Sequence, residues 1–438
     1  MLPSGLKNSL NQIREISSEI YTKYIPIIDD DTDISKFAEP ILNFPVVRNE
    51  FLNQLINKIV YTQFISKRFN NPLKMLEGDK IPVGYAGEEI YVNPVKGRQF
   101  NTNDFAGLLQ KYEADVKVQY TTVNTDLQYP VTISRHKLKE AFTSWSNLTS
   151  FIDELSGALY NAAYIDEYSL TKSLVSTAYM NNSVQTVVVD AVTDEATGKT
   201  FTRVARQYFL DFQAPSSKFN GWALVGGYGR PVTTWTRPDD VVFLIRNDLR
   251  SRLDVDVLAS AFNMDKADLM GRIIAVDNFD IYSTETGAKV FDGSKILGIM
   301  ADKSWFRIKE QDMYLDEFYN ANNRTWNYYL NVTKMYNYSL FANAIVFCTE
   351  APNVPVQGLT YNQESPVQIK KGEYEGLEIT VTPANATGEI TYKSNNNNVT
   401  VEKIDNKNIK VTGNTVGESV ITAQSGNVKT TITISVTE

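Results

Sequence analysis

Two periodicities divide this chain. Near the N-terminus, apolar residues recur every three or four positions, which is the pattern of an amphipathic helix. The residues of this face are Leu6, Leu10, Ile13, Ile16 and Ile20. A second pattern of this kind, from about Val46 to Phe64, predicts another helix. Such a face must be covered by its own domain or by a neighbouring molecule, and the pattern leaves both possibilities open.

Residues 70–133 lose the helical period. Proline and glycine interrupt short alternating runs such as Glu89–Val92, and alternation returns at Val116, Val118 and Tyr120. Two alternating ribbons around a polar tip predict a long β-hairpin that is poor in core residues. Because an isolated two-stranded hairpin is only marginally stable in water, we expect it to lie against something outside its own domain.

The longest helical pattern covers residues 136–181. Its continuous apolar stripe consists of Leu148, Phe151, Ile152, Leu155, Leu159, Ala162 and Ala163. We expect this helix to be the spine of its domain. A strand-like run at Val184–Val189 and a helix near Phe201–Phe212 follow it.

The segment from Asp239 to Phe347 is dominated by short apolar runs. These runs cover Val241–Ile245, Ile273–Val276 and Ile296–Met300, and a helical pattern at Asp254–Phe262 lies among them. Aromatic residues are frequent in its last part: Trp326, Tyr328, Tyr329, Tyr336, Tyr338, Phe341 and Phe347. Short apolar strands with a helix between them predict a covered sheet in an α/β or α+β domain.

The clearest boundary lies at Pro352–Pro355. Beyond it there is no helical periodicity, and short alternating runs recur between turn residues every 8–12 positions or so. The runs are 377–381, 390–392, 399–401, 409–411, 420–422 and 431–436. They predict a small all-β sandwich of about 80 residues.

Composition places the chain among ordinary globular proteins. It has 438 residues, of which 42% are hydrophobic and 21% charged, and this length suffices for about two or three domains. The formal net charge of -8 argues against sequence-independent nucleic-acid binding, which needs clustered Lys and Arg. No apolar run approaches the roughly 20 residues that span a bilayer, and Met1–Leu10 lacks the apolar core of a signal peptide. We therefore expect an intracellular product without membrane contact.

Candidate chemistry is sparse. The single cysteine, Cys348, excludes an intrachain disulfide, and with one histidine, His136, the chain cannot build a recognisable zinc site. We interpret His136 as a solvated or capping residue at a helix start. The acidic run Asp29–Asp33 lacks the Gly and Glu of a calcium loop and is interpreted as a solvated turn. Gly226–Arg230 has the spacing of neither a P-loop nor a dinucleotide fingerprint, so we expect no catalytic residue, no metal and no cofactor.

The C-terminal part resembles the bacterial immunoglobulin-like group 2 domain. The resemblance rests on Val381–Thr387, Ile390–Asn395, Val411–Gly413 and Gly417–Ala423. Tyr392 departs from the tryptophan that is usual in that family, although both residues fill a sandwich core. This domain type is attached to adhesins, enzymes and virion proteins, so by itself it indicates no function.

Residues 1–350 are similar to the major capsid proteins of small short-tailed bacteriophages, the podophages of Gram-positive hosts. The matching blocks occur in one order along the chain: Asn70–Lys74, Ile81–Gly84, Glu88–Tyr91, Leu138–Phe142, Ser144-Trp145, Asp166–Tyr168, Leu253–Ala259, Ala261–Met264, Asp302-Lys303, Trp305-Phe306, Trp326–Tyr329 and Phe341–Ala344. Members of that group also carry the immunoglobulin-like domain at the C-terminus.

This resemblance implies an α+β tailed-phage major capsid fold followed by an all-β immunoglobulin-like sandwich. Residues 1–45 would form an N-terminal arm and 46–350 the capsid body. Within the body, an extended E-loop would lie in 71–130, a peripheral domain would hold the spine helix at about 147–181, and an axial domain would cover about 215–350. The immunoglobulin-like domain would occupy 354–438.

The resemblance further implies a function in the virion. The chain would assemble in the host bacterial cytoplasm as pentamers and hexamers, into an icosahedral or prolate shell around double-stranded DNA. Expected partners are further copies of the chain, a scaffolding protein, a portal, DNA held non-specifically and host glycans at the C-terminal domain. The residues expected at subunit interfaces are Leu6, Leu10, Ile13, Glu88, Glu89, Tyr91 and Arg98.

Two other functions are compatible with an appended immunoglobulin-like domain. A secreted glycan-binding adhesin or glycosidase with an appended sandwich would need export and a marked pair of carboxylates, and the sequence indicates neither. Glu88 and Glu89, for example, would point to opposite faces of a strand. A tail or fibre protein would need repetitive β-rich or coiled-coil sequence, which is also not visible.

Overall fold

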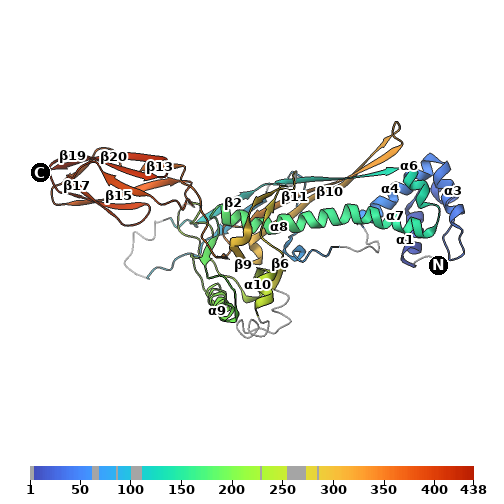
Figure 1. The fold of residues 1–438 in the computed structure, drawn as a ribbon, viewed down its shortest axis with the longest axis horizontal. Coiled ribbons are helices and arrows are strands. Elements are labelled where there is room, and N and C mark those ends of the chain that lie inside the picture. The colour runs from blue at the N-terminus through green and yellow to red at the C-terminus, as the bar shows by residue number, and fades with distance from the viewer. Residues whose placement is uncertain are drawn as a thin grey trace. The chain divides into compact units, whose positions relative to one another are not determined.

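The computed structural model describes residues 4–61, 69–84, 87–99, 111–226, 229–253, 273–283 and 286–438. Figure 1 shows the ribbon with its helices and strands labelled. The chain divides into two compact units. Unit 1 contains Met1–Gly87, Thr121–Thr171 and Arg307–Tyr336. Unit 2 contains Glu88–Tyr120, Lys172–Phe306 and Asn337–Glu438.

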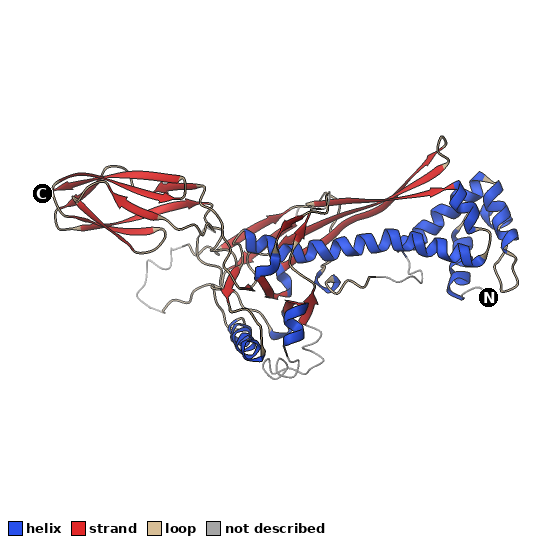
Figure 2. Ribbon diagram, in the orientation of Figure 1, coloured by secondary structure: helices blue, strands red, loops and turns tan. Residues whose placement is uncertain are grey.

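Unit 1 gathers most of its helices in one cluster (Figure 2). Its helices are α1 (Ser4–Ile16), α2 (Glu19–Tyr24), α3 (Ile34–Asn43), α4 (Pro45–Tyr61), α6 (Arg135–Ala141), α7 (Trp145–Ser156) and the first part of α8 (Ala162–Met180). Several begin at a side chain that accepts a backbone N–H of the first turn. Ser18 caps α2, Asp33 caps α3 and Ser144 caps α7. The acidic run before α3 is an exposed turn, as predicted, and its last residue, Asp33, caps the helix, which the sequence analysis did not foresee.

The apolar face of the N-terminal helix is covered by its own unit and not by a neighbouring molecule. The side chains of Leu6, Leu10 and Ile13 are 5%, 2% and 0% exposed and belong to the same core as those of α4, α7 and β11. Aromatic rings join the helices, with Phe37 lying 5.7 Å from Phe51 and 5.8 Å from Phe142. The first helix therefore packs on its own domain.

The helical pattern predicted over 136–181 is present but interrupted: α6 ends at Ala141, and Ser144 caps a new helix that begins at Trp145. Helices α7 and α8 are joined by a π-helical segment, Gly157–Asn161, so that helical structure runs from Trp145 to Met180. Such segments place one extra residue in a turn and shift the faces on either side. The apolar stripe predicted the helix but gave no sign of this segment.

A three-stranded sheet completes unit 1. Its order is β10-β11-β3, with β3 at Thr125–Ser134, β10 at Phe306–Asn320 and β11 at Thr325–Tyr338. Strands β11 and β3 are antiparallel, and Trp326 pairs with Ile133. The sequence did not reveal β10, because burial alternates only along its first half and the second half is exposed and polar or aromatic.

The main sheet of unit 2 has five strands in the order β4-β12-β9-β5-β6. They are β4 (Gln185–Val188), β12 (Ala344–Cys348), β9 (Ile296–Asp302), β5 (Val241–Arg246) and β6 (Ile273–Val276). Strands β5, β9 and β12 are buried along almost their whole length, which confirms the predicted covered sheet. Gly298 permits the close pairing of β9 with β5, since a Cβ there would lie 2.5 Å from the Leu244 carbonyl oxygen.

Helix α9 (Glu195–Asp211) covers one face of this sheet through Phe201, Ala205 and Phe209. It begins six residues earlier than the sequence predicted, because Asp194 and Thr197 form a capping box. The short helix α10 (Asn247–Arg252) follows β5 directly. The helix expected at Asp254–Phe262 lies outside the described residues.

The remaining elements of unit 2 before the C-terminal segment are short. They are β1 (Gly87–Val92), β2 (Val116–Thr121), β7 (Ile281–Tyr282), β8 (Lys289–Phe291) and the 3₁₀ turns Pro238–Asp240, Gly293–Lys295 and Lys303–Trp305. Another 3₁₀ turn, Lys74–Leu76, belongs to unit 1. Strands β1 and β2 form a two-stranded sheet, as do β7 and β8.

After Pro355 the chain contains strands only (Figure 2). Two four-stranded sheets, β13-β15-β18-β17 and β14-β20-β19-β16, share one apolar core. Their strands are β13 (Gly358–Tyr361), β14 (Val367–Lys370), β15 (Tyr374–Thr382), β16 (Thr391–Ser394), β17 (Val399–Lys403), β18 (Asn408–Gly413), β19 (Gly417–Ser425) and β20 (Val428–Thr437). Each predicted run coincides wholly or mostly with a strand. Among the described residues, no helix has the length and apolar character needed to cross a membrane.

Candidate subunit-interaction surfaces

Strands β1 and β2 form an antiparallel ribbon at the base of the predicted hairpin. At one end the Thr121 hydroxyl donates to the Gly87 carbonyl, and at the other the Asn93 N–H donates to the Asp115 carbonyl at 2.9 Å. Residues 93–99 and 111–115 continue the two arms without strand pairing, and the tip lies outside the described residues. The ribbon therefore has two faces formed by alternate side chains.

The inner face of the ribbon packs on other residues of its own unit, unit 2. The Tyr91 hydroxyl donates to the Thr233 carbonyl, and its ring lies 5.7 Å from that of Phe341. Glu89 accepts a hydrogen bond from the Ser339 hydroxyl at 2.8 Å. The expectation that the hairpin lies only against something outside its own domain is thus wrong for its base, where Tyr91 joins an apolar cluster with Trp222 and Phe341.

A buried lysine, Lys117, also stabilises the inner face of the ribbon. The Lys117 ammonium is 1% exposed and lies 2.7 Å from Asp115, which also accepts a hydrogen bond from the Asn93 amide at 2.6 Å. The hydrogen bonds from Lys117 and then from Asn93 hold the pKa of Asp115 below its usual range. The carboxylate thus stays ionised and holds the two arms together where strand pairing ends.

The outer face of the ribbon is apolar and exposed. Ile90 and Val92 on β1 are 59% and 53% exposed, and Val116 and Tyr120 on β2 are 42% and 72% exposed. Glu88 shares this face, so the prediction that Glu88 and Glu89 point in opposite directions is confirmed. Large contiguous apolar surface is unusual on a monomer and marks interaction sites.

Arg98 lies beyond the strands. Its guanidinium is exposed and stands over the ring of Tyr112 at 5.1 Å, a contact between the two arms of the hairpin. Of the residues predicted at interfaces, Glu88 and Arg98 are therefore on exposed surface, whereas Glu89 and Tyr91 contact their own unit. Leu6, Leu10 and Ile13 are corrected to core residues, since buried side chains offer no surface to a neighbour.

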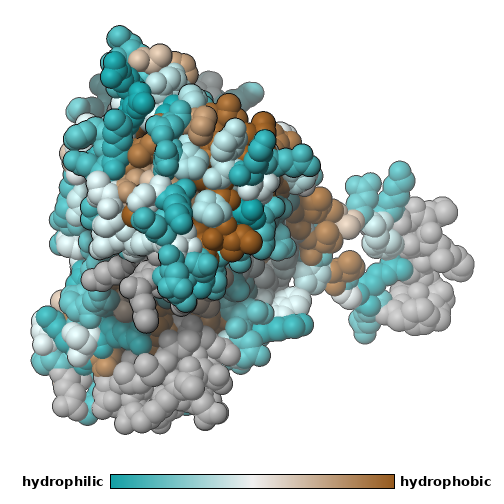
Figure 3. All heavy atoms as spheres, turned by 90° about the vertical axis from the view of Figure 1, so that its right-hand side faces the viewer, coloured by the Kyte–Doolittle hydropathy of each residue, from teal (hydrophilic) through white to brown (hydrophobic). Residues whose placement is uncertain are grey.

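A second exposed apolar surface lies on the helical cluster of unit 1, and it includes Ile16 and Ile20 of the apolar face predicted near the N-terminus. Its residues are Ile16, Ile20, Tyr24, Ile27, Phe44 and Val46, which are between 42% and 66% exposed. The rings of Tyr24 and Phe44 are 4.8 Å apart, so part of the surface is continuous across α2 and the end of α3. Figure 3 shows hydrophobic patches among polar side chains in the view from this end.

A buried charge network stabilises unit 1. The Lys334 ammonium, 6% exposed, lies 3.0 Å from Glu77, 2.9 Å from Glu167 and 3.6 Å from Glu310. Lys74 and Lys80 supply two further positive charges, to Glu77 and Glu310 respectively. The network thus balances three lysines against three glutamates and joins the segment around Glu77 to α8, β10 and β11. Four of its members, Lys74, Glu167, Glu310 and Lys334, line a cavity of about 130 Å³.

The pKa values of this network favour its charged form. Burial alone would lower the pKa of Lys334, but the charges of Glu167 and Glu77 outweigh burial and raise it. Burial also opposes ionisation of Glu310, yet the hydrogen bond from Lys80 and the charge of Lys334 hold its pKa below the usual range. The resulting stability is lost as the pH falls through the folded-state pKa of Glu310 or rises through that of Lys334.

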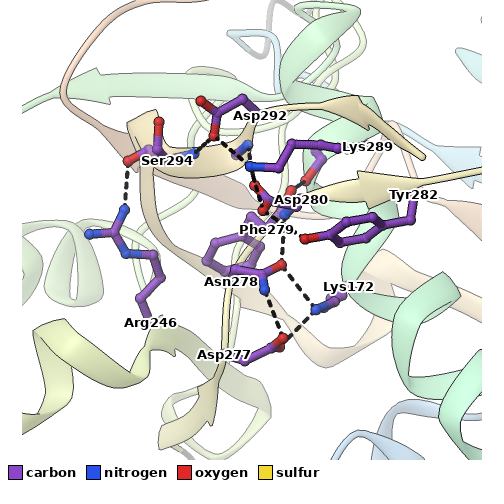
Figure 4. Close-up of polar contacts among 12 residues, drawn as sticks. Lys172, Arg246, Asp277, Asn278, Phe279, Asp280, Tyr282, Lys289, Asp292 and Ser294 are labelled. Atoms are coloured by element: carbon purple, nitrogen blue, oxygen red, sulfur yellow. Dashed lines mark hydrogen bonds and ion pairs between the residues drawn. The ribbon is translucent and has the colours of Figure 1, made fainter. Parts of the chain in front are cut away.

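A second polar network fastens residues 277–294 to α8 in unit 2 (Figure 4). The Lys172 ammonium contacts Asp277 at 2.7 Å and Asn278 at 3.1 Å. Further along, Asp280 lies 2.9 Å from Lys289 and accepts the Gly293 N–H at 2.8 Å. The carboxylates are neutralised by lysines and backbone donors, and no group suited to a metal ion occurs in the described part of the chain.

The residues considered for chemistry occupy unremarkable positions. The His136 side chain is 84% exposed on α6, beside Glu140, in agreement with a solvated residue. Cys348 is buried in β12, and burial raises the pKa of its thiol to about 11. A thiol of this kind is inert under ordinary conditions. Of the glycine-rich loop, residues 227 and 228 lie outside the described residues.

Comparison with known proteins places these features in a family. Residues 10–348 match the profile of the family described as Phi29-like phage major capsid protein. The chain is 30% identical to the major capsid protein of Bacillus phage PZA over 342 residues, which cover 77% of this chain and 72% of that protein. It is 25% identical to the major capsid protein of Streptococcus phage Cp-1, over 76% of this chain and 92% of the other.

Solved structures agree in fold. The capsid structure of Staphylococcus phage Andhra superposes with a TM-score of 0.54 at 16% sequence identity, over 66% of this chain and 87% of that one. At this identity the likeness shows the fold alone, which is that of tailed-phage capsid proteins.

Proposed function

This chain belongs to the Phi29-like phage major capsid protein family and is a structural protein of a phage capsid, and from this premise we propose how it builds the shell. We infer that copies assemble as pentamers and hexamers into an icosahedral or prolate shell around double-stranded DNA. In this proposal unit 1 contains the N-terminal arm and the spine helix of the peripheral domain up to Thr171. The proposed axial domain, about 215–350, lies in unit 2 except for Arg307–Tyr336, which belong to unit 1. The chain needs no cofactor and catalyses no reaction.

The proposal rests on the exposure of large apolar side chains on the outer face of the β1–β2 ribbon. Four large side chains on it are more than 40% exposed, although the opposite face is packed on unit 2. Leaving them in water costs the free energy that their burial would contribute, about 25 cal/mol per Å². A neighbouring subunit that covers this face would recover it.

The apolar surface on the helical cluster of unit 1 is a suitable counterpart. The two surfaces differ, so a contact between them joins unlike patches of two identical chains. Heterologous contacts of this type close into rings when the rotation permits, which is what pentamers and hexamers require. Glu88 and Arg98 would then lie at the edge of the interface, where charges set register and specificity more than affinity.

Charging the ribbon should abolish shells without unfolding the chain. In the variant Ile90→Lys with Val92→Lys, two exposed side chains become charges that an interface would have to desolvate. We expect at least about tenfold fewer assembled particles in sedimentation and negative-stain images. The matched control is Val188→Lys with Val290→Lys, two valines on other strands that are 58% and 67% exposed. Undiminished particle yield in the ribbon variant would contradict this interface.

Other partners follow from the same proposal. A scaffolding protein would guide closure and a portal would occupy one vertex, while packaged DNA would be held without sequence preference. The alternative function, a secreted adhesin or glycosidase, receives no support from the relatives, all of which are capsid proteins.

We further propose that residues 354–438 form an immunoglobulin-like domain that decorates or clamps the shell. The segment has its own apolar core, which includes Leu377, Ile409 and Ile421, and it follows a proline-rich connection. Binding of host glycans is a second role that we propose for this segment.

Removing residues 354–438 should leave a chain that folds, because the core of the deleted segment is separate. We expect a soluble protein whose elution volume in size-exclusion chromatography corresponds to its smaller mass. The backbone amides of β5, β9 and β12 should be protected from hydrogen exchange as in the full-length chain. Shells should still form, with lower resistance to heat or urea if the domain clamps them. Insoluble protein after the deletion would show that the segment is part of the body's fold.

A further inference from the structure

The cavity of about 130 Å³ in unit 1 lies between the three-stranded sheet and the part of α8 that belongs to this unit. On the sheet side it is lined by Leu330 and Val332 of β11 and by Leu127 of β3, which pairs with Val332. On the helix side, Ala163 and Glu167 are four positions apart and therefore lie on one face of α8. Ala163 is the smallest side chain of the lining, so the helix leaves space above the sheet at this point.

The cavity has the size of one six-membered ring. Apolar cavities of about 150 Å³ in protein interiors bind benzene. Aliphatic and aromatic side chains form most of this lining, and among the described lining residues only Lys74 is exposed. The Lys74 ammonium lies 6.0 Å from the ring centroid of Tyr164, which also lines the cavity. The cavity is therefore entered beside Lys74 and is shielded from water elsewhere.

One polar group of the lining has no partner. Tyr336 is 6% exposed, and its backbone N–H and carbonyl are hydrogen-bonded to the Asn124 side chain. Its hydroxyl makes no hydrogen bond with any of the residues that the structure describes. Burial raises the pKa of Tyr336, and the charges of Lys334 and Glu167, two other lining residues, act on it as well. The hydroxyl thus keeps its proton, and leaving such a group buried and unpaired costs free energy.

The charged groups of the lining are already satisfied. Lys334 is balanced by glutamates, and Glu167 also accepts a hydrogen bond from the Asn71 amide at 2.9 Å. The Tyr129 hydroxyl donates to Asp166 at 3.0 Å. A charged ligand would disturb this balance of three lysines and three glutamates, whereas a neutral group can pair with the remaining hydroxyl, which both donates and accepts.

From this geometry we propose that the cavity binds a small neutral molecule composed of one ring and a hydroxyl or carbonyl group. The ring lies against Leu330 and Val332, and the polar group pairs with the Tyr336 hydroxyl. Few polar groups on an apolar lining are typical of small-molecule sites. Water is the other candidate occupant, but a buried water needs two to four polar partners, and the apolar walls offer none. A bound ring would contact β3, β11 and α8 together and so brace the helix against the sheet.

The test titrates para-fluorophenol and fluorobenzene into the purified full-length chain and follows both probes by fluorine NMR. The site lies within one subunit, so the measurement does not depend on the proposed shell. We expect para-fluorophenol to bind with a dissociation constant of about 1 mM or below. It should bind about fivefold more tightly than fluorobenzene, because it alone can form a hydrogen bond with Tyr336.

Two variants and a matched control make the test specific. Tyr336→Phe removes only the unpaired hydroxyl, so it should be as stable as the wild type and bind the two probes with equal affinity. Ala163→Leu adds three carbon atoms to the cavity and should weaken the binding of both probes at least about tenfold. Ala162→Leu makes the same change at a described neighbour outside the lining and should bind as the wild type does.

Hydrogen exchange locates the bound probe. At ten times the dissociation constant of para-fluorophenol, exchange that requires opening of β11 or of α8 before Thr171 should slow about elevenfold. Amides of β5 and β9 in unit 2 should exchange as before.

Three results would overturn the proposal. Failure of both probes to bind at about 10 mM would mean that the cavity holds only water. A preference for para-fluorophenol that persists in Tyr336→Phe would remove the role of the hydroxyl, and undiminished binding in Ala163→Leu would place the ring elsewhere. If Ala163→Leu does not fold, the comparison of the two probes in Tyr336→Phe decides alone.

Discussion

Replacing Lys334 with methionine is expected to lower the free energy of unfolding of unit 1 by about 3–5 kcal/mol. The substitution preserves length and removes one of three positive charges from a network in which Glu77, Glu167 and Glu310 are 11% exposed or less. One buried carboxylate then has no lysine to balance its charge, so the free-energy cost of removing that carboxylate from water is no longer offset. Hydrogen exchange of peptides from α8, β10 and β11 measures this free energy directly.

Two further variants make the Lys334 prediction specific. Lys137→Met removes an equal charge from a pair with Glu154, in which both side chains are more than half exposed, and should cost less than about 1 kcal/mol. Adding Glu167→Gln to Lys334→Met restores the balance of charge and should recover part of the lost stability. Wild-type protection in Lys334→Met, or no recovery in the double variant, would show that the network does not stabilise unit 1.

Truncating Phe347 to alanine should destabilise unit 2 by about 3–5 kcal/mol. The ring is 0% exposed, and its centroid lies 5.4 Å from that of Phe201 and 5.8 Å from that of Phe243. It therefore connects β12 with α9 and β5, and its removal leaves a cavity that a close-packed core fills only in part. Thermal unfolding and hydrogen exchange of β5, β9 and β12 report the loss.

Phe318→Ala provides the matched control for Phe347. It deletes the same ring from β10, where the side chain is 59% exposed, and should change the stability by about 0.5 kcal/mol or less. Similar effects of the two substitutions would mean that α9 and the sheet are not held together through Phe347.

Local periodicity predicted much of the fold. The apolar runs at Val241–Ile245 and Ile296–Met300 became the central strands of a covered sheet, because buried strands need apolar residues on both faces. The helices near the N-terminus and the spine helix followed in the same way from residues spaced three and four apart. Strand β10 was missed, since its exposed half lacks alternation.

Periodicity could not identify what covers a face. It marked Leu6, Leu10 and Ile13 as apolar, but whether a neighbour or α4 buries them depends on tertiary structure. In the β1–β2 ribbon only one of the two faces is covered. The inner face packs through Tyr91 on Phe341, 250 positions away, whereas the outer face stays exposed. No local signal distinguishes these two faces in an alternating sequence.

The charge network around Lys334 could not be predicted from local sequence patterns either. Lys334 contacts Glu77 and Glu167 across 257 and 167 positions, and each residue alone resembles an ordinary surface charge in the sequence.

Electron microscopy of the chain co-expressed with its phage scaffolding protein tests the central claim most directly. We predict closed shells with pentameric and hexameric units, in which a reconstruction places Ile90 and Val92 of one subunit against the surface of another. A chain that stays monomeric under these conditions would contradict the shell function. Shells in which the outer face of the ribbon remains exposed would contradict the interface on which the proposed assembly depends.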